Sequence, residues 1–134
     1  MTRESHELAI AARALVGCRF RLRGRNPVTG IDCVGLVICA LAAIGRTPPR
    51  TPHYTLRNIE AGPLLELVPK AGFRKTCGGL ETGDLVILKP SPGQYHLAIA
   101  ETGARLIHAH AGLGRVVVTP APAPLLNAEH WRLF

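Results

Sequence analysis

The sequence is poor in aromatic residues and contains no long apolar run. Aromatic side chains make up 4% of the 134 residues, which leaves few surfaces on which the bases of single-stranded nucleic acid could stack. The longest apolar stretch runs from Cys33 to Ile44. It holds about a dozen residues, whereas a membrane-spanning helix needs about 20. We therefore expect no membrane span and no nucleic-acid partner.

Metal ligands are numerous, but they do not form a metal-binding pattern. Four cysteines and six histidines include no CxxC pair and no HxxxH pair, whereas structural zinc sites normally show closely spaced ligands. Only His108 and His110 have a spacing that suits two ligands on one strand. The sequence predicts no metal and no other cofactor, and a metal site at these histidines is the less favoured alternative.

Acidic residues are also scarce. Nine of them stand against 16 lysines and arginines, which gives a net charge of +7 and an isoelectric point near 9.9. This balance favours an anionic partner, and nucleic acid, an acidic membrane surface and the bacterial cell wall all fit it. Four arginines alternate and would project from one face of an extended strand: Arg19, Arg21, Arg23 and Arg25. A basic nucleic-acid-binding domain is therefore one alternative, although we prefer a solvated basic loop.

The N-terminal segment lacks the continuous apolar region of a secretion signal. Its apolar residues are interrupted by Arg13 and recur at helical spacing, which predicts an amphipathic helix over residues 5–16. We expect a protein that is made in the cytoplasm without a signal peptide. Its four cysteines are therefore expected to be reduced.

Helix signals come first along the chain and strand signals follow. The apolar run after Asp32 predicts a buried helix, since Asp32 suits the capping position and Gly45 suits the end. Residues 63–68 predict a short helix or turn. Five strands are expected after that, separated by turn residues: Asp84–Leu88, Tyr95–Ala100, Arg105–Ala109, Arg115–Thr119 and, at the edge, His130–Phe134. This order predicts a single α+β domain over residues 1–134.

Cys33 opens the predicted buried helix and is the first candidate for chemistry. The N–H groups and the dipole at a helix N-terminus favour an anion, so a thiol there is expected to have a lowered pKa and to react as a thiolate. We accordingly expect Cys33 to be alkylated faster than Cys39 or Cys77. Gly35 would allow another backbone or a substrate to approach closely. The alternative is that Cys33 is a small buried residue without a chemical role.

The histidines of two neighbouring strands strengthen the case for Cys33. An odd-length loop near Thr102 would place His96 opposite either His108 or His110, and all three on one face of the sheet. Directly opposed side chains lie close enough for a base to meet the group that orients it. The pattern therefore predicts a base, His96, with an orienting residue, and leaves both His108 and His110 open for that role.

Four segments, taken in order, resemble the NlpC-type cell-wall peptidase family. They are GCRFRLRGRNPVTGIDCVGLV (Gly17–Val37), GDLV (Gly83–Val86), HLAI (His96–Ile99) and LIHA (Leu106–Ala109). The twelve-residue step from His96 to His108 is also typical of that family. The resemblance implies a papain-like fold, in which N-terminal helices, including a buried nucleophile helix, pack on an antiparallel sheet of about five strands. It also implies a Cys33–His96–His108 triad.

The resemblance further implies a cysteine endopeptidase acting on the stem peptides of peptidoglycan, commonly at the γ-D-glutamyl–diamino acid bond. In this interpretation His96 activates Cys33 and His108 fixes the tautomer of His96. The residues expected to line the substrate site are Asp32, Arg23, Phe20, Gly35 and His110.

Three differences from the family pattern bear on function. Phe20 stands where the family usually has Tyr, so a hydroxyl that helps at the oxyanion site is missing; Val34 replaces the usual Ser; and Arg23 replaces one of two loop glycines. An inactive peptidase-like domain for binding or particle assembly is therefore another alternative. A short form with a late tryptophan, Trp131, resembles peptidases of phage tails. This resemblance implies phage-tail or phage-like particle proteins as partners, and action at the cell wall by particle delivery or lysis.

Overall fold

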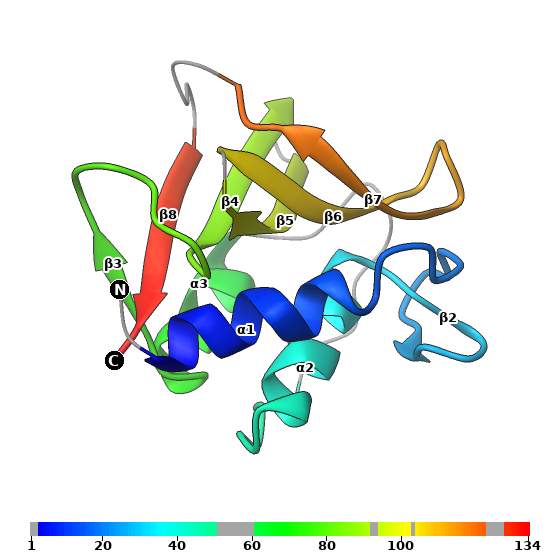
Figure 1. Ribbon diagram of the computed structural model, residues 1–134, viewed down its shortest axis with the longest axis horizontal. Helices are drawn as coiled ribbons and strands as arrows, with labels where there is room; N and C mark the ends of the chain where they lie inside the picture. The colour runs from blue at the N-terminus through cyan, green and yellow to red at the C-terminus, as the bar shows by residue number, and fades with distance from the viewer. Residues whose placement is uncertain (1–2, 51–60, 92–93, 103, 123–127) are drawn as a thin grey trace.

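The computed structural model describes residues 3–50, 61–91, 94–102, 104–122 and 128–134 (Figure 1). Helices and strands follow one another as α1 (Arg3–Arg13), β1 (Arg25–Asn26), β2 (Gly30–Ile31), α2 (Cys33–Ala43), α3 (Ala61–Lys70), β3 (Phe73–Thr76), β4 (Leu85–Ser91), β5 (Gln94–Glu101), β6 (Arg105–His110), β7 (Arg115–Pro120) and β8 (Ala128–Leu133). The predicted order of helices before the sheet is confirmed.

Helix α2 has the boundaries that its sequence predicts. The Asp32 side chain caps it by accepting a 2.8 Å hydrogen bond from the Gly35 backbone N–H, and Gly45 follows its end with a φ of 86°. Most of its side chains are buried, as expected for a helix that is apolar nearly all round. None of the helices in the described part of the chain is long and apolar enough to cross a membrane.

Six antiparallel strands form the main sheet, in the order β3-β8-β4-β5-β6-β7. Two details of the sequence prediction are therefore wrong. The sheet has one strand more than the five expected, because β3 was missed: Phe73 is buried, but the next residues, Arg74 and Lys75, are exposed and give no apolar alternation. The C-terminal strand β8 is not at an edge, since it pairs with β3 on one side and β4 on the other.

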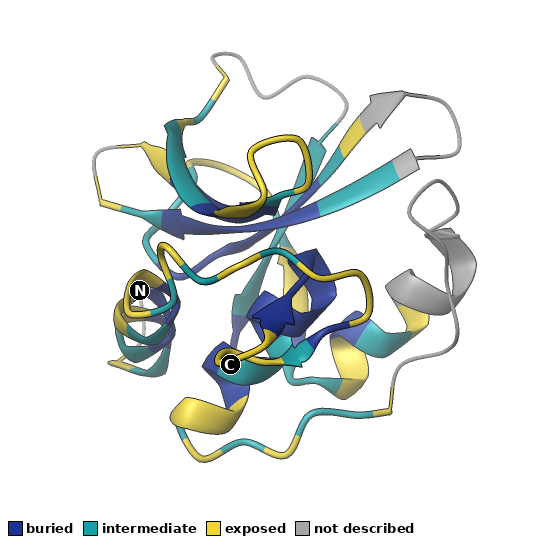
Figure 2. Ribbon diagram, turned by 90° about the vertical axis from the view of Figure 1, so that its right-hand side faces the viewer, coloured by how far each residue is buried: buried dark blue, intermediate teal, exposed yellow. Residues whose placement is uncertain are grey.

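The hydrophobic core lies between the helices and one face of the sheet. Helices α1 and α2 pack against each other and against β5 (Figure 1). Figure 2 shows the buried residues concentrated in α2 and in the central parts of the strands. The opposite face of the sheet carries a second, smaller cluster of buried residues: Val86, Ala98, Ala100 and Leu106. Because most of α2 is buried in the core between the helices and the sheet, its first residue is held against the sheet.

The arginine-rich segment before α2 is a folded turn and not the extended strand considered above. Strands β1 and β2 pair antiparallel, and the Gly24 N–H donates to the Arg21 carbonyl at 2.8 Å. Arg23 adopts a positive φ of 60°, and the Arg25 guanidinium binds the Asp32 carboxylate at 3.1 Å. The four alternating arginines therefore do not project from one strand face.

Candidate active site

Cys33 is the first residue of α2, and 5% of its surface is exposed. Its sulfur lies against three backbone N–H groups: its own, that of Val34 and that of Leu97. Leu97 directly follows His96 on β5, so the start of α2 meets β5 next to that histidine. The start of α2 therefore lies beside the backbone of β5, one residue after the histidine that the sequence analysis selected as base.

Burial raises the pKa of the Cys33 thiol to about 12, and the negative charge of the neighbouring Asp32 acts in the same direction. The backbone N–H groups around the sulfur lower the pKa, but they do not offset the cost of placing a thiolate in an apolar environment. The expectation of a lowered pKa at this helix start is therefore wrong. Burial of the sulfur outweighs the effect of the helix N-terminus, and the resting residue is a thiol.

His96 and His108 form a direct hydrogen bond, with 2.9 Å between His96 Nε2 and His108 Nδ1 and their rings edge to face at 5.0 Å. Strand β5 ends at Glu101 and β6 begins at Arg105, and Ile99 pairs with Ile107, so the register meets the condition on which the sequence argument depends. Continued along both strands, this register aligns His96 with His110. The His96 ring nevertheless reaches diagonally to His108, a distance that long side chains can bridge.

Both imidazoles of this pair are neutral at pH 7. The pKa of His96 is lowered to about 4, mainly by burial and to a smaller extent by the charges of His108 and His110. Burial also lowers the pKa of His108, with a contribution from His110. Among the described residues, the Cys33 sulfur and the His96 ring share no hydrogen bond. His96 Nε2 is engaged by His108, so Nδ1 is the nitrogen left to accept a proton.

Thr119 is a further member of the cluster that the sequence analysis missed. Its hydroxyl lies 2.9 Å from His108 Nε2. Strand β7 pairs with β6 so that His108 faces Val117 and Leu106 faces Thr119, which makes Thr119 a diagonal neighbour of His108. The signal for this contact lies in the two consecutive predicted strands, Arg105–Ala109 and Arg115–Thr119, because a hairpin between them brings Thr119 next to His108.

The sequence model of the NlpC/P60 family matches residues 17–132. The chain belongs to the NlpC/P60 family. A comparison with functionally curated proteins finds no match.

Solved structures of other NlpC/P60 proteins share the fold of this domain. The P60 domain of antigen MAP1204 from M. avium subspecies paratuberculosis is 18% identical, with a TM-score of 0.65 over 97% of this chain and 94% of that one. The NlpC/p60 domain of the peptidoglycan hydrolase SagA is 22% identical, with a TM-score of 0.60 over 97% of this chain and 98% of that one. The peptidoglycan hydrolase RipB from Mycobacterium tuberculosis is 21% identical, with a TM-score of 0.66 over 98% of this chain and 68% of that one. The predicted α+β, papain-like fold is confirmed.

Asp32 anchors the loop before α2 of this NlpC/P60 domain to that helix. Its carboxylate is 2% exposed and accepts hydrogen bonds from the Gly35 N–H at 2.8 Å, the Arg23 N–H at 2.8 Å and the Arg25 guanidinium at 3.1 Å. The structure thus uses this residue, predicted to line the substrate site, to cap α2 and to fix the loop before it. The Arg23 side chain is exposed.

Gly35 provides the second anchor, because the Gly24 carbonyl packs directly against its Cα. A methyl group on Gly35 would overlap that backbone oxygen. Glycine to alanine inside a helix normally stabilises by about 1 kcal/mol. For Gly35→Ala we expect the opposite sign, a loss of about 2 kcal/mol in the free energy of unfolding, because the overlap forces the loop away. Urea denaturation measures this change.

Gly79→Ala is the matched control, since a methyl group there meets nothing within 4 Å. We expect it to change the free energy of unfolding by less than about 0.5 kcal/mol. Equal stability of the Gly35→Ala variant and the wild-type protein would show that the loop is not locked to the helix.

Phe20 and His110 both form hydrogen bonds with the turn formed by residues 111–114. The Phe20 N–H donates to the Gly114 carbonyl at 2.8 Å, and its half-buried ring packs against the core. His110 Nδ1 accepts from the Leu113 N–H at 3.0 Å, and its ring lies 5.8 Å from that of His108. His110 therefore flanks the His96–His108 pair without joining its hydrogen bonds. In the described part of the chain, no group of three or more His, Cys, Asp or Glu side chains is arranged to hold a metal ion.

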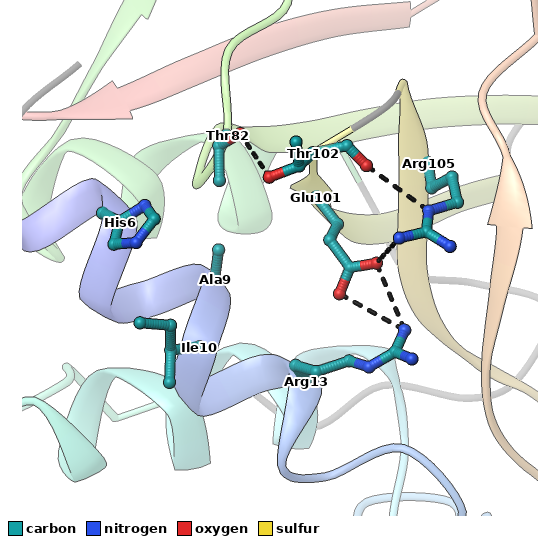
Figure 3. Close-up of a pocket in the computed structure, with 8 residues that line it drawn as sticks. All are labelled: His6, Ala9, Ile10, Arg13, Thr82, Glu101, Thr102 and Arg105. Atoms are coloured by element: carbon teal, nitrogen blue, oxygen red, sulfur yellow. Dashed lines mark hydrogen bonds and ion pairs between the residues drawn. The ribbon is translucent and has the colours of Figure 1, made fainter.

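A separate hollow of about 340 Å³ lies at the other end of β5 from His96 (Figure 3). Glu101 is bound there by Arg13 of α1 at 3.2 Å and by Arg105 of β6 at 2.9 Å. Figure 3 shows both guanidinium groups converging on this one carboxylate. The arrangement ties α1 to the β5–β6 hairpin, so the charged groups of the hollow have a structural role.

The burial of Cys33 changes what thiol labelling should show. At pH 7 we expect iodoacetamide to modify the exposed Cys77 first and Cys33 at least about 100-fold more slowly, because alkylation needs an accessible thiolate. This reverses the order expected from the helix position alone. Mass spectrometry of digested, labelled protein gives the rates, and denatured protein provides the control in which the cysteines react alike. Faster labelling of Cys33 in the folded protein would contradict the raised pKa.

Proposed function

We propose that this chain is a cysteine peptidase that hydrolyses peptide bonds in the stem peptides of bacterial peptidoglycan, with Cys33 as nucleophile, His96 as base and His108 as the residue that orients His96. The hydrogen bond between His96 Nε2 and His108 Nδ1, beside the start of α2, is the observation that carries the proposal. Membership of the NlpC/P60 family and the likeness in fold to the peptidoglycan hydrolases SagA and RipB support the substrate class.

Because the resting pair is a thiol and a neutral imidazole, the proton moves during the attack. The Cys33 sulfur forms a bond to the carbonyl carbon of the substrate while its proton passes to His96 Nδ1. The carbonyl oxygen becomes an oxyanion. When the tetrahedral intermediate collapses, the C–N bond breaks and the His96 imidazolium protonates the leaving amine. Water, deprotonated by His96, then hydrolyses the thioester and restores the thiol.

Backbone N–H groups are the donors available for the developing negative charge. Those of Cys33, Val34 and Leu97 already surround the sulfur, and the α2 dipole adds to their effect. Phe20 has no hydroxyl to contribute. An oxyanion site made of backbone N–H groups is compatible with Phe20 where the family usually has Tyr, and this is why we favour catalysis over an inactive binding domain.

Digestion of purified muropeptides, followed by mass spectrometry, tests the proposal and identifies the bond. We propose the γ-D-glutamyl–diamino acid bond. Cleavage there would leave the fragment with the glutamyl residue at its C-terminus and the diamino acid at a new N-terminus. Cleavage at a different bond would change this assignment, and absence of any cleavage by folded protein would contradict the peptidase function. Delivery by a phage-like particle and action at the cell wall stay predictions.

A further inference from the structure

Thr119 extends the pair of imidazoles into a line of three side chains. Strand β7, which carries Thr119, lies beside β6 (Figure 1). The Thr119 hydroxyl is 2.9 Å from His108 Nε2, and His108 Nδ1 is 2.9 Å from His96 Nε2. The line runs from β7 through β6 to β5. It ends at the histidine that precedes Leu97, whose N–H contacts the Cys33 sulfur.

A neutral imidazole carries one N–H, so the protons along this line have two ordered arrangements. In the first, His96 Nε2–H donates to His108 Nδ1, and His108 Nε2–H donates to the Thr119 oxygen. In the second, the Thr119 hydroxyl donates to His108 Nε2, and His108 Nδ1–H donates to His96 Nε2. The two differ at the end near Cys33, because His96 Nδ1 is unprotonated in the first arrangement and protonated in the second.

We propose that Thr119 is a positioning residue: its oxygen accepts a hydrogen bond from His108 Nε2–H and thereby holds both imidazoles in the tautomers that leave His96 Nδ1 free to take the thiol proton. The inference rests on the proposed function of Cys33 and His96. It adds the residue that decides between two proton arrangements, of which only the first lets His96 act as a base.

Two features favour Thr119 as the acceptor. Its side chain is half-buried and has no second hydrogen-bond partner among the described residues, so the hydroxyl proton is free to face water. When His96 takes the thiol proton, both its nitrogens carry N–H, and His96 Nε2–H must donate to His108 Nδ1. His108 then has its own proton on Nε2, facing Thr119. The first arrangement therefore persists through the proton transfer without rearrangement, whereas the second would have to invert.

Nitrogen NMR of the imidazole rings reads the tautomers directly, independently of activity. In two-bond ¹H–¹⁵N correlation spectra of the full-length protein we expect His96 and His108 both to carry the proton on Nε2. Thr119→Val keeps the shape of the side chain but removes its oxygen, so we expect His96 Nδ1–H to become populated. Thr119→Ser should restore the wild-type tautomers. Thr102→Val removes an exposed hydroxyl at the far end of the hairpin and serves as the matched control, with no change at either ring.

Muropeptide hydrolysis provides the second readout. We expect Thr119→Val to lower kcat by about tenfold with KM unchanged, and Thr119→Ser to stay within about twofold of the wild-type protein. His108 found as the Nδ1–H tautomer in the wild-type protein would overturn the inference, and that measurement needs no variant to fold. Tautomers that are identical in the wild-type protein and Thr119→Val would overturn it as well, while leaving the peptidase function intact. If wild-type protein cleaves no muropeptide, the proposed function is wrong and the role of Thr119 in the reaction falls with it.

Discussion

Replacing the sulfur of Cys33 by oxygen is expected to abolish muropeptide cleavage. Cys33→Ser keeps nearly the same side-chain size at the start of α2, but a hydroxyl gives up its proton far less readily than a thiol. His96, whose pKa is about 4, is too weak a base to compensate. We expect kcat to fall by about 10⁴-fold or more. Mass spectrometry of the digest should therefore show products with the wild-type protein and none with the variant.

Cys77→Ser provides the control for this experiment, because it makes the same change at an exposed cysteine. We expect it to cleave at the wild-type rate. Equal cleavage by Cys33→Ser would assign the reaction to another residue. If folded wild-type protein cleaves nothing while still binding the muropeptides, the peptidase-like binding domain considered because of Phe20 becomes the better description.

Local sequence signals predicted the elements of the fold but not all of their neighbours. Asp32 and Gly45 mark the ends of α2 by side-chain and backbone preferences that act within one helical turn. The place of β8 between β3 and β4 depends on pairs such as Val86 with His130, which are far apart in the sequence. A terminal strand carries no local signal of whether one or two partners flank it, so its interior position could not be predicted.

For the candidate site, too, local signals predicted the strands that carry the histidines but not every contact between their side chains. Alternation places His96 and His108 on one face only if the two strands pair in an even register, and the pairing of Ile99 with Ile107 supplies that register. It is the diagonal contact, and not the register, that joins His96 to His108 and leaves His110 beside the pair. The pKa of Cys33 could not be predicted, because helix position lowers it and burial raises it, and only the packed structure shows which effect is larger.

Asp84, fully buried before β4, joins the last strand to the rest of the sheet. Its carboxylate accepts hydrogen bonds from Arg132 Nε at 2.8 Å, from His130 Nδ1 at 2.9 Å and from the Glu81 N–H at 2.9 Å. Burial raises the pKa of Asp84, but these hydrogen bonds and the charge of Arg132 outweigh it, so the pKa lies below its usual value. The ionised carboxylate is thus the form that the fold stabilises.

Asp84→Ala is therefore expected to lower the free energy of unfolding by about 3 kcal/mol at pH 7. It leaves the half-buried His130 without its acceptor and removes the buried one of the two carboxylates that bind Arg132. A carboxyl whose pKa is lower in the folded state stabilises the protein above its unfolded pKa of about 3.9 and loses that contribution as the pH falls. The difference between wild-type protein and variant should accordingly shrink below pH 4. Urea denaturation at pH 7 and at pH 3 measures both values.

Glu129→Ala is the matched control, a carboxylate on β8 that binds the mostly exposed Lys75 and accepts a hydrogen bond from Trp131 Nε1 at 3.0 Å. We expect it to lower the free energy of unfolding by less than about 1 kcal/mol at pH 7. An Asp84→Ala variant that is no less stable than Glu129→Ala, or a loss that is equally large at pH 3 and pH 7, would contradict the role assigned to the Asp84 carboxylate. A loss that is large at pH 7 and small at pH 3 is expected only if the charge of Asp84 holds β8 in the sheet.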